Sequence, residues 1–310
     1  MSPRIFIDGE AGTTGLQIQQ RLAMRQDISL MSIDPLHRKD PAARADMLNQ
    51  ADLVILCLPD DAAREAVTLI RSPSVKIIDA SSAHRTAAGW TYGFAEMDPD
   101  QRAAIVASRR VSNPGCYPTG AIALIRPLVS SGLLPSDYPV TINAVSGYTG
   151  GGKAMIAEFE SSDGEAFRAY GLSLQHKHVP EMTVYAGLAQ PPVFAPSVAR
   201  FAQGMIVEIP LHLDRLSGGP GIRDIQAVLE QAYRNEAFVD VVPLSQTSKL
   251  DRLNPEVLNG TNHLRLHVFG PEGGRQARLV AVLDNLGKGA SGAAVQNMNL
   301  MLGLAEGAGL

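Results

Sequence analysis

Two kinds of residue in this chain of 310 could carry covalent and acid–base chemistry: a cysteine and a pair of histidines. Cys116 lies in the segment NPGCYPTG, which follows an apolar run and precedes a helical pattern over residues 121–125. This order places its sulfur at a helix N-terminus, where the helix dipole and free N–H groups favour a thiolate. The same N–H groups could hold the oxyanion that forms when a thiolate attacks a carbonyl. We therefore predict that Cys116 is a nucleophile.

A thiolate nucleophile usually works with a base, and the segment QHKHVPE supplies two histidines. We interpret His178 as the group that accepts and returns the proton. His176 is then a substrate contact or the neighbour that orients His178. Two histidines at i and i+2 could also pair on a metal, but no further ligand cluster completes such a site, so we expect none. Cys57, within the apolar run LVILCL, is interpreted as a small buried hydrophobic residue.

A glycine-rich turn connects the first apolar run, residues 5–7, to a helical pattern. Glycines there let the backbone approach a pyrophosphate, which binds at the positive end of the helix. The spacing is GxxGxxG, not the commoner GxGxxG, because position 10 is Glu. The alternative is a glycine-rich connection without a ligand. We predict a dinucleotide site with these contacts: Gly9, Gly12, Thr13, Thr14 and Gly15.

The residues after the second apolar run bear on the choice between two cofactors. Asp34 stands where a carboxylate that binds the ribose of NAD is expected, although it could instead cap the following turn. Arg38 and Lys39 follow closely, and a guanidinium group pairs well with a 2′-phosphate. We favour NADP, with Arg38 as the phosphate contact.

Composition argues against several other classes of protein. The chain has 27 basic and 31 acidic residues, a net charge of −4, which argues against a nucleic-acid partner. No stretch approaches the roughly 18 uncharged apolar residues of a membrane span. Two cysteines provide no disulfide framework, and no signal-peptide core precedes the first strand. We expect a cytoplasmic protein with small-molecule ligands.

Strand and helix patterns alternate over the first third of the chain, which predicts an α/β fold with a doubly wound, Rossmann-like N-terminal domain. We expect strands over 5–7, 29–33, 53–58 and 75–79, with helices over 15–24, 60–70 (capped by Asp60 or Asp61) and 99–108. Strand-like segments at 140–145, 205–213, 263–269 and 278–283 predict an α+β second domain, whose alternating faces suggest an interface. An apolar stripe over 290–304 predicts a C-terminal helix that packs back on the first domain.

Three segments together resemble one family: IDGEAGTTGL (7–16), SNPGCYPT (112–119) and HKHVPE (176–181). They are similar to the shorter type of N-acetyl-γ-glutamyl-phosphate reductase, in the aspartate-semialdehyde dehydrogenase superfamily. The resemblance covers essentially the whole chain, including SGYTGGGK (146–153) and DNLGKGA (284–290). The stretch DASSAHR (79–85) replaces DLSADFR of the longer type and keeps its arginine, Arg85.

The resemblance implies reduction of N-acetyl-L-glutamyl 5-phosphate by NADPH to N-acetyl-L-glutamate 5-semialdehyde, with release of phosphate, in arginine biosynthesis. It assigns a thioester to Cys116 and the acid–base role to His178. Gly147 and Asn285 join the expected cofactor contacts, and the expected substrate contacts are Asn113, His176, Arg85 and Lys153. We expect a homodimer or homotetramer, an NADP-binding domain of residues 1–115 plus 286–310, and a catalytic and dimerisation domain of residues 116–285.

Several alternatives stay open on the sequence alone. An aspartate-semialdehyde dehydrogenase would share mechanism and cofactor but act on a shorter substrate with a free amino group. A binding protein that senses NADP without turnover is the second alternative. Lys153 and Arg85 could be solvated surface charges, and Asn285 could be a turn former.

Overall fold

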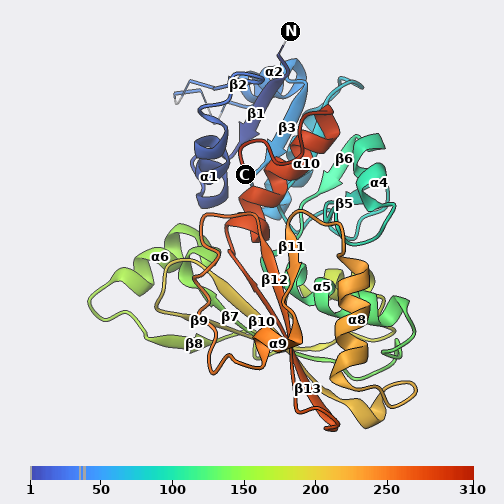
Figure 1. Ribbon diagram of the computed structural model, residues 1–310. Coiled ribbons are helices and arrows are strands. Elements are labelled where there is room, and N and C mark those ends of the chain that lie inside the picture. The colour runs from blue at the N-terminus through green and yellow to red at the C-terminus, as the bar shows by residue number, and fades with distance from the viewer. Residues whose placement is uncertain (1, 35, 38–39) are drawn as a thin grey trace. The chain divides into compact units, whose positions relative to one another are not determined.

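A computed structural model describes residues 2–34, 36–37 and 40–310 and shows two compact units (Figure 1). Unit 1 runs to Ala95 and adds Pro99–Pro114 and Ala290–Leu310. Unit 2 comprises Glu96–Asp98 and Gly115–Gly289. These ranges differ by one to four residues at each boundary from the domains expected from the sequence, and they transfer the short segment 96–98 to the second unit.

Unit 1 contains a six-stranded, all-parallel sheet with the order β2-β1-β3-β4-β6-β5. Its strands are β1 (Arg4–Asp8), β2 (Ser29–Met31), β3 (Leu53–Leu56), β4 (Lys76–Asp79), β5 (Thr91–Tyr92) and β6 (Arg110–Ser112). The helices are α1 (Thr13–Leu22), α2 (Pro41–Gln50), α3 (Asp60–Leu69), α4 (Gln101–Ala107) and α10 (Gly292–Leu302). This arrangement confirms the doubly wound fold.

The central strands are apolar along their whole length because each face of the sheet is covered. Ile5 and Ile7 of β1 belong to one hydrophobic core, whereas Phe6 between them belongs to the core on the opposite face. Val295 and Met298 of α10 lie in the same core as Ile5, so the C-terminal helix does pack on the first unit, as expected.

The start of α3 differs from the sequence expectation. The helix begins at Asp60 with Pro59 in the capping position, and no side chain caps it. Asp60 is the first helical residue, and its carboxylate accepts hydrogen bonds from the backbone N–H (3.0 Å) and the hydroxyl of Ser82. The expectation that Asp60 or Asp61 caps this helix is therefore wrong. The helix predicted over 99–108 likewise begins two residues later, at Gln101.

Unit 2 contains a seven-stranded mixed sheet with the order β11-β12-β13-β10-β7-β9-β8. Its strands are β7 (Thr141–Gly147), β8 (Phe167–Ala169), β9 (Val193–Ala199), β10 (Met205–His212), β11 (Val239–Val241), β12 (Leu264–Phe269) and β13 (Gln276–Leu283). The helices and helical turns are α5 (Cys116–Ser130), η1 (Tyr148–Gly151), α6 (Gly152–Glu160), α7 (Val179–Ala186), η2 (Leu213–Arg215), α8 (Ile222–Ala232), α9 (Leu244–Thr247) and the first three residues of η3 (Gly287–Ser291). This mixture confirms the α+β architecture.

The two faces of the second sheet differ in how they are covered. Helix α5 lies against β10 and β13 on one face, and a β-carbon at Gly120 would come within 3.0 Å of Val207 and 3.2 Å of Ala281. On the other face a small cluster that includes Ile206, Val280 and Leu258 is buried. None of the helices within the described part of the chain is long and apolar enough to cross a membrane.

Candidate active site

Cys116 is the first residue of α5, with Gly115 in the capping position. The backbone N–H and the hydroxyl of Thr119 both donate to the carbonyl of Gly115 (3.0 and 2.9 Å), which closes the first turn of the helix. No side chain among the described residues caps α5, and the first N–H groups of a helix have no partner within it. The half-buried side chain of Cys116 therefore lies at the end of the helix where the dipole favours negative charge.

A buried carboxylate joins this turn to the histidine segment. Glu181, in the first turn of α7, is 1% exposed, and its Oε2 accepts a hydrogen bond from the backbone N–H of Gly115 (3.1 Å). His178 occupies the capping position of the same helix. The bond thus holds the start of α7 beside the start of α5. Sequence reasoning gave Glu181 no role, although its place three residues after His178 puts it on the same side of the helix.

The two histidines lie against each other. The backbone N–H of His178 donates to Nδ1 of His176 (3.1 Å), and the two ring centres are 4.7 Å apart. Since Nδ1 of a neutral His176 accepts this bond, its proton is on Nε2. Tyr117 is the residue after Cys116. The centre of its ring lies 5.9 Å from the ring centre of His178 and 6.3 Å from that of His176. The structure therefore places both predicted histidines against the ring of the residue that follows the predicted nucleophile.

Two tyrosines complete this cluster, and the sequence analysis missed both. The hydroxyl of Tyr170 donates to that of Tyr117 (3.2 Å), which donates in turn to the carbonyl of Ser197 (3.0 Å). Burial, together with the neighbouring Tyr170 and Cys116, raises the pKa of Tyr117 well above its ordinary value. Burial and the negative charge of Cys116 raise the pKa of Tyr170 to about 12. Both phenols therefore stay neutral and donate hydrogen bonds.

Within the described residues, no three His, Cys, Asp or Glu side chains gather as metal ligands.

The turn after β13 packs directly on the nucleophile. A β-carbon at Gly289 would lie 2.8 Å from the β-carbon of Cys116, so only glycine allows this approach. The N–H of Gly289 donates to the carbonyl of Asp284 (2.9 Å). The fully buried carboxylate of Asp284 accepts from the amide of Gln203 (2.6 Å) and from the N–H groups of Gly260 (2.8 Å) and Leu286 (2.9 Å).

The expected cofactor residues of unit 2 lie in well-packed surroundings. Asn285 is 1% exposed, its Oδ1 accepts from the N–H of Gly204 (2.7 Å), and its Nδ2 donates to the hydroxyl of Thr149 (3.2 Å). A β-carbon at Gly147 would come within 2.5 Å of the carbonyl oxygen of Ala202. Glycine at 147 is thus required for backbone packing, whatever else it contacts.

The glycine-rich turn of unit 1 has the close packing that a phosphate cradle needs. Gly9 has a φ of +91°, and a β-carbon there would lie 2.4 Å from the carbonyl oxygen of Cys57. A β-carbon at Gly15 would lie 2.5 Å from the carbonyl oxygen of Gly9. Helix α1 begins at Thr13, directly after Gly12, and no side chain in the described part of the chain caps it. The turn therefore offers the N-terminal N–H groups of α1 to an anion.

The expected 2′-phosphate contact, Arg38, lies outside the described residues. Asp34 is exposed and its Oδ1 accepts from the N–H of Leu36 (2.9 Å), which is the capping role considered as its alternative.

Two of the expected substrate contacts, Asn113 and Arg85, make hydrogen bonds within unit 1. Asn113 is 1% exposed: its Nδ2 donates to the carbonyl of Ala290 (2.9 Å) and its Oδ1 accepts from Asn297 (3.2 Å). Arg85 is 8% exposed, and its guanidinium donates to the carbonyls of Asn113 (3.1 Å) and Ala80 (3.3 Å). Arg85 is therefore no solvated surface charge. Lys153, by contrast, is exposed near the start of α6.

Comparisons with known proteins agree with this organisation. Residues 14–105 match the NAD-binding domain of semialdehyde dehydrogenases, and residues 116–285 match their dimerisation domain. An N-acetyl-γ-glutamyl-phosphate reductase of Rhizobium etli is 58% identical over 97% of this chain and 99% of its own length. One of Brucella suis is 56% identical over 98% of this chain and 100% of its own.

Solved structures show the same fold at low sequence identity. Aspartate semialdehyde dehydrogenase II of Vibrio cholerae, complexed with ASA, is 14% identical, with a TM-score of 0.73 over 97% of this chain and 98% of that one. The aspartate semialdehyde dehydrogenase of Candida albicans, solved with NADP, is 12% identical, with a TM-score of 0.64 over 97% and 99%. On the strength of its near full-length identity to the curated relatives, the chain belongs to the N-acetyl-γ-glutamyl-phosphate reductase family, a group of oxidoreductases within the semialdehyde dehydrogenases.

Proposed function

We propose that the protein reduces N-acetyl-L-glutamyl 5-phosphate with NADPH to N-acetyl-L-glutamate 5-semialdehyde and inorganic phosphate, as a step of arginine biosynthesis. The curated relatives bear the name of this reductase. The structural observation that carries the proposal is the junction of α5 and α7. There Cys116 and His178 stand at the starts of two helices that the bond from Gly115 to Glu181 holds together.

The chemistry of the chain's own residues follows from this junction. The thiol proton of Cys116 passes to His178 while the sulfur attacks the acyl carbon. The N–H groups at the start of α5 stabilise the oxyanion, and the C–O bond breaks with its electron pair on the departing phosphate. When bound, NADPH supplies the hydride that reduces the resulting thioester. The C–S bond then breaks, its electron pair returns to sulfur with the proton from His178, and the aldehyde leaves.

The four expected substrate residues divide into two pairs in this proposal. His176, with its proton on Nε2, and the exposed Lys153 are assigned direct contact with the substrate. Asn113 and Arg85 are assigned a positioning role, because their polar groups hold the chain just before Cys116.

For the cofactor we propose NADP in preference to NAD. The diphosphate is assigned to the turn from Gly9 to Gly15, where a β-carbon at either end would collide with a backbone carbonyl oxygen. Arg38 is assigned the 2′-phosphate, and Gly147 and Asn285 the nicotinamide end. The fold neighbour from Candida albicans, solved with NADP, supports this choice. Asp34, already used in a turn, gives no support to NAD.

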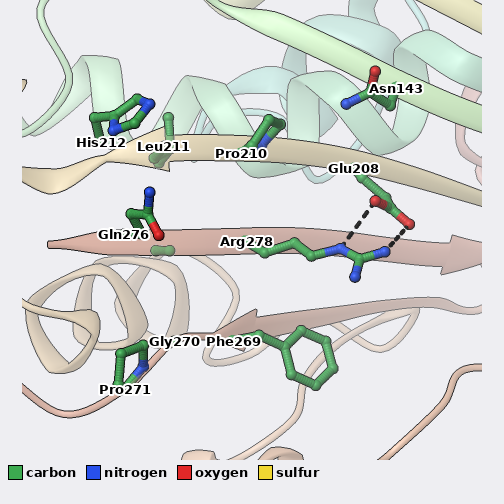
Figure 2. A pocket seen from close by; sticks show the side chains of 11 residues that line it. Asn143, Glu208, Pro210, Leu211, His212, Phe269, Gly270, Pro271, Gln276 and Arg278 are labelled. Atoms are coloured by element: carbon green, nitrogen blue, oxygen red, sulfur yellow. Dashed lines mark hydrogen bonds and ion pairs between the residues drawn. The ribbon is translucent and has the colours of Figure 1, made fainter. Parts of the chain in front are cut away.

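For assembly we propose a homodimer, or a tetramer built from it, in which a second copy covers the face of the unit 2 sheet opposite α5. Figure 2 shows this face at β10 and β13, with the ion pair between Arg278 and Glu208 (Nε–Oε2 2.9 Å) crossing the two strands. A hollow of about 370 Å³ lies there, lined in part by Phe269 and Pro210. The matching family domain is described as a dimerisation domain. We also propose a cytoplasmic location. It agrees with the finding that neither cysteine forms a disulfide.

The purified protein tests the reaction in the reverse direction, with NADP, phosphate and N-acetylglutamate semialdehyde as substrates and NADPH absorbance as the readout. We expect turnover that requires phosphate and is much faster than turnover with aspartate semialdehyde. A strong preference for aspartate semialdehyde, or binding of NADP without turnover of either aldehyde, would overturn the proposal. Replacing NADP by NAD in the same assay tests the cofactor.

A further inference from the structure

Lys288 carries a positive charge into the interior of unit 2. The residue is 2% exposed, and its ammonium group lies 2.6 Å from Oε1 of Glu96, which is 3% exposed. The same ammonium lies 5.5 Å from the centre of the Phe238 ring. Removing two such charges from water costs several kcal/mol per ion, and an apolar pair of the same volume would often be as stable. The pair therefore calls for an explanation other than stability.

Its place in the chain supplies one. Lys288 belongs to η3, a turn of π-helix that follows β13. Turns of this kind are rare and recur at functional sites. The next residue, Gly289, packs on Cys116, and a β-carbon there would lie 2.8 Å from the Cys116 β-carbon and 3.2 Å from its α-carbon. The backbone that touches the nucleophile is thus one residue away from the buried ion pair.

We propose that Lys288 and Glu96 are positioning residues, whose ion pair holds Gly289 against Cys116 and so fixes the sulfur for attack. A shift of η3 by one residue, toward an ordinary α-helical register, would withdraw the ammonium of Lys288 and leave a buried charge without its counterion. The pair therefore penalises every register but one, which is the best-attested use of buried charges. An apolar pair would fill the same space without selecting the register.

Precise placement of the sulfur matters because the attack needs the sulfur about 3–3.5 Å from the acyl carbon and above the plane of its carbonyl group, and a displacement of about 1 Å costs on the order of 100-fold in rate. The turn is fixed from its other end by Asp284, whose carbonyl accepts from the N–H of Gly289. Lys288 and Asp284 thus hold the two sides of the residue that supports the nucleophile.

The test is the double variant Lys288→Met/Glu96→Leu, which removes both charges together and leaves no buried ion. We expect it to fold with the native circular dichroism spectrum, to lose about 10- to 100-fold in kcat, and to keep KM for the aldehyde within about twofold. The rate at which iodoacetamide alkylates Cys116, followed on its peptide by mass spectrometry over a range of pH, should change by more than about threefold. A role confined to stability would leave that rate unchanged in the folded protein.

Asp98→Asn is the matched control. It breaks the ion pair between Asp98 and Arg126 (Oδ1–Nε 2.7 Å), which ties the same segment 96–98 to α5 without touching η3. This variant should lose stability and keep both kcat and the alkylation rate. A folded double variant whose kcat and alkylation rate both match the wild type would overturn the inference. Should the double variant not fold, Lys288→Arg keeps the charge but changes its reach, and wild-type values for that variant would overturn the inference equally.

The loss of kcat rests on the proposed function, whereas the alkylation measurement does not. If the wild type is alkylated at Cys116 but turns over neither aldehyde, the proposed function fails and the comparison of alkylation rates still decides the role of the ion pair.

Discussion

The carboxylate of Glu181 accepts a hydrogen bond from the backbone N–H of Gly115, across 66 residues of sequence. One partner immediately precedes the nucleophile Cys116, and the other lies in the first turn of the helix that His178 begins. The distance between sulfur and imidazole therefore depends on a bond that involves neither side chain.

Glu181→Ala should loosen this junction. A hydrogen bond to a buried carboxylate stabilises by about 1.5–3 kcal/mol, and its removal leaves the N–H of Gly115 without an acceptor. We expect a loss of about 1–3 kcal/mol in the free energy of unfolding, measured in urea, and a fall in kcat of at least about 10-fold. Glu181→Gln keeps an acceptor oxygen in the same place and should retain most of the stability. If the alanine variant unfolds at the same urea concentration as the wild type, the junction is not held by this bond.

Cys116→Ser should abolish turnover and leave dinucleotide binding intact. A serine hydroxyl is far less ionised than a thiol at neutral pH, and the thioester cannot form without sulfur. We expect a fall in kcat of at least about 1,000-fold, with the dissociation constant for NADP, measured by fluorescence titration, within about twofold of the wild type. Appreciable turnover by this variant would remove Cys116 from the reaction.

Cys57→Ser is the matched control for that experiment. Burial, together with Asp79 and Asp8, raises the pKa of the Cys57 thiol to about 12, so the group stays protonated and unreactive at neutral pH. Iodoacetamide should therefore label Cys116 alone in the native wild type. The Cys57 variant should keep its activity, and labelling of Cys57 before unfolding would contradict this assignment.

Much of the fold could be predicted because the pattern of side chains reports directly on burial. The run LVIL over 53–56 is apolar at every position because both faces of the parallel sheet are covered, and the structure places all four residues in the interior. Cys116 could be placed at a helix start because Asn-Pro-Gly is a typical turn sequence and a helical pattern follows it directly. These inferences use neighbouring residues only.

The rest of the site depends on pairs that are far apart in the sequence. Nothing in the local pattern says that Tyr170 reaches Tyr117, or that Glu181 reaches Gly115. An arginine such as Arg85 is usually expected on the surface. Only the tertiary structure shows that its guanidinium is buried against backbone carbonyls. Composition and spacing therefore identify which groups could react, and long-range packing decides which of them are free to do so.

Gly9→Ala tests the phosphate cradle. The φ of +91° and the approach of a β-carbon to within 2.4 Å of the Cys57 carbonyl oxygen leave no room for a side chain. We expect the free energy of unfolding of unit 1 to fall by on the order of 2 kcal/mol or more. The affinity for NADP, measured by calorimetry, should fall at least about 10-fold.

Gly89→Ala separates the close contact from the backbone strain. Gly89 also has a positive φ, +81°, but nothing lies within 4 Å of the position of its β-carbon. The free energy of unfolding of this variant should fall by only about 1 kcal/mol, and the variant should bind NADP as the wild type does. If both variants bind NADP normally, the turn at Gly9 is a connection without a ligand.

His267 should make the stability of the protein fall in mild acid. The residue, on β12, is 3% exposed, and burial, with the charge of Arg265 adding to it, lowers the pKa of its imidazole to about 4. In the unfolded chain a histidine takes up its proton near pH 6.5, whereas the folded protein does so only near pH 4. Stability is therefore unaffected by this group above about pH 6.5 and is lost progressively as the pH falls from about 6.5 to about 4, by on the order of 3 kcal/mol in total.

His267→Gln removes the titrating group while keeping a polar side chain of similar length. The difference in unfolding free energy between variant and wild type, measured in urea between about pH 7 and about pH 5, should therefore shift steadily in favour of the variant. A difference that stays constant over this range would show that His267 takes up its proton equally well in the folded state.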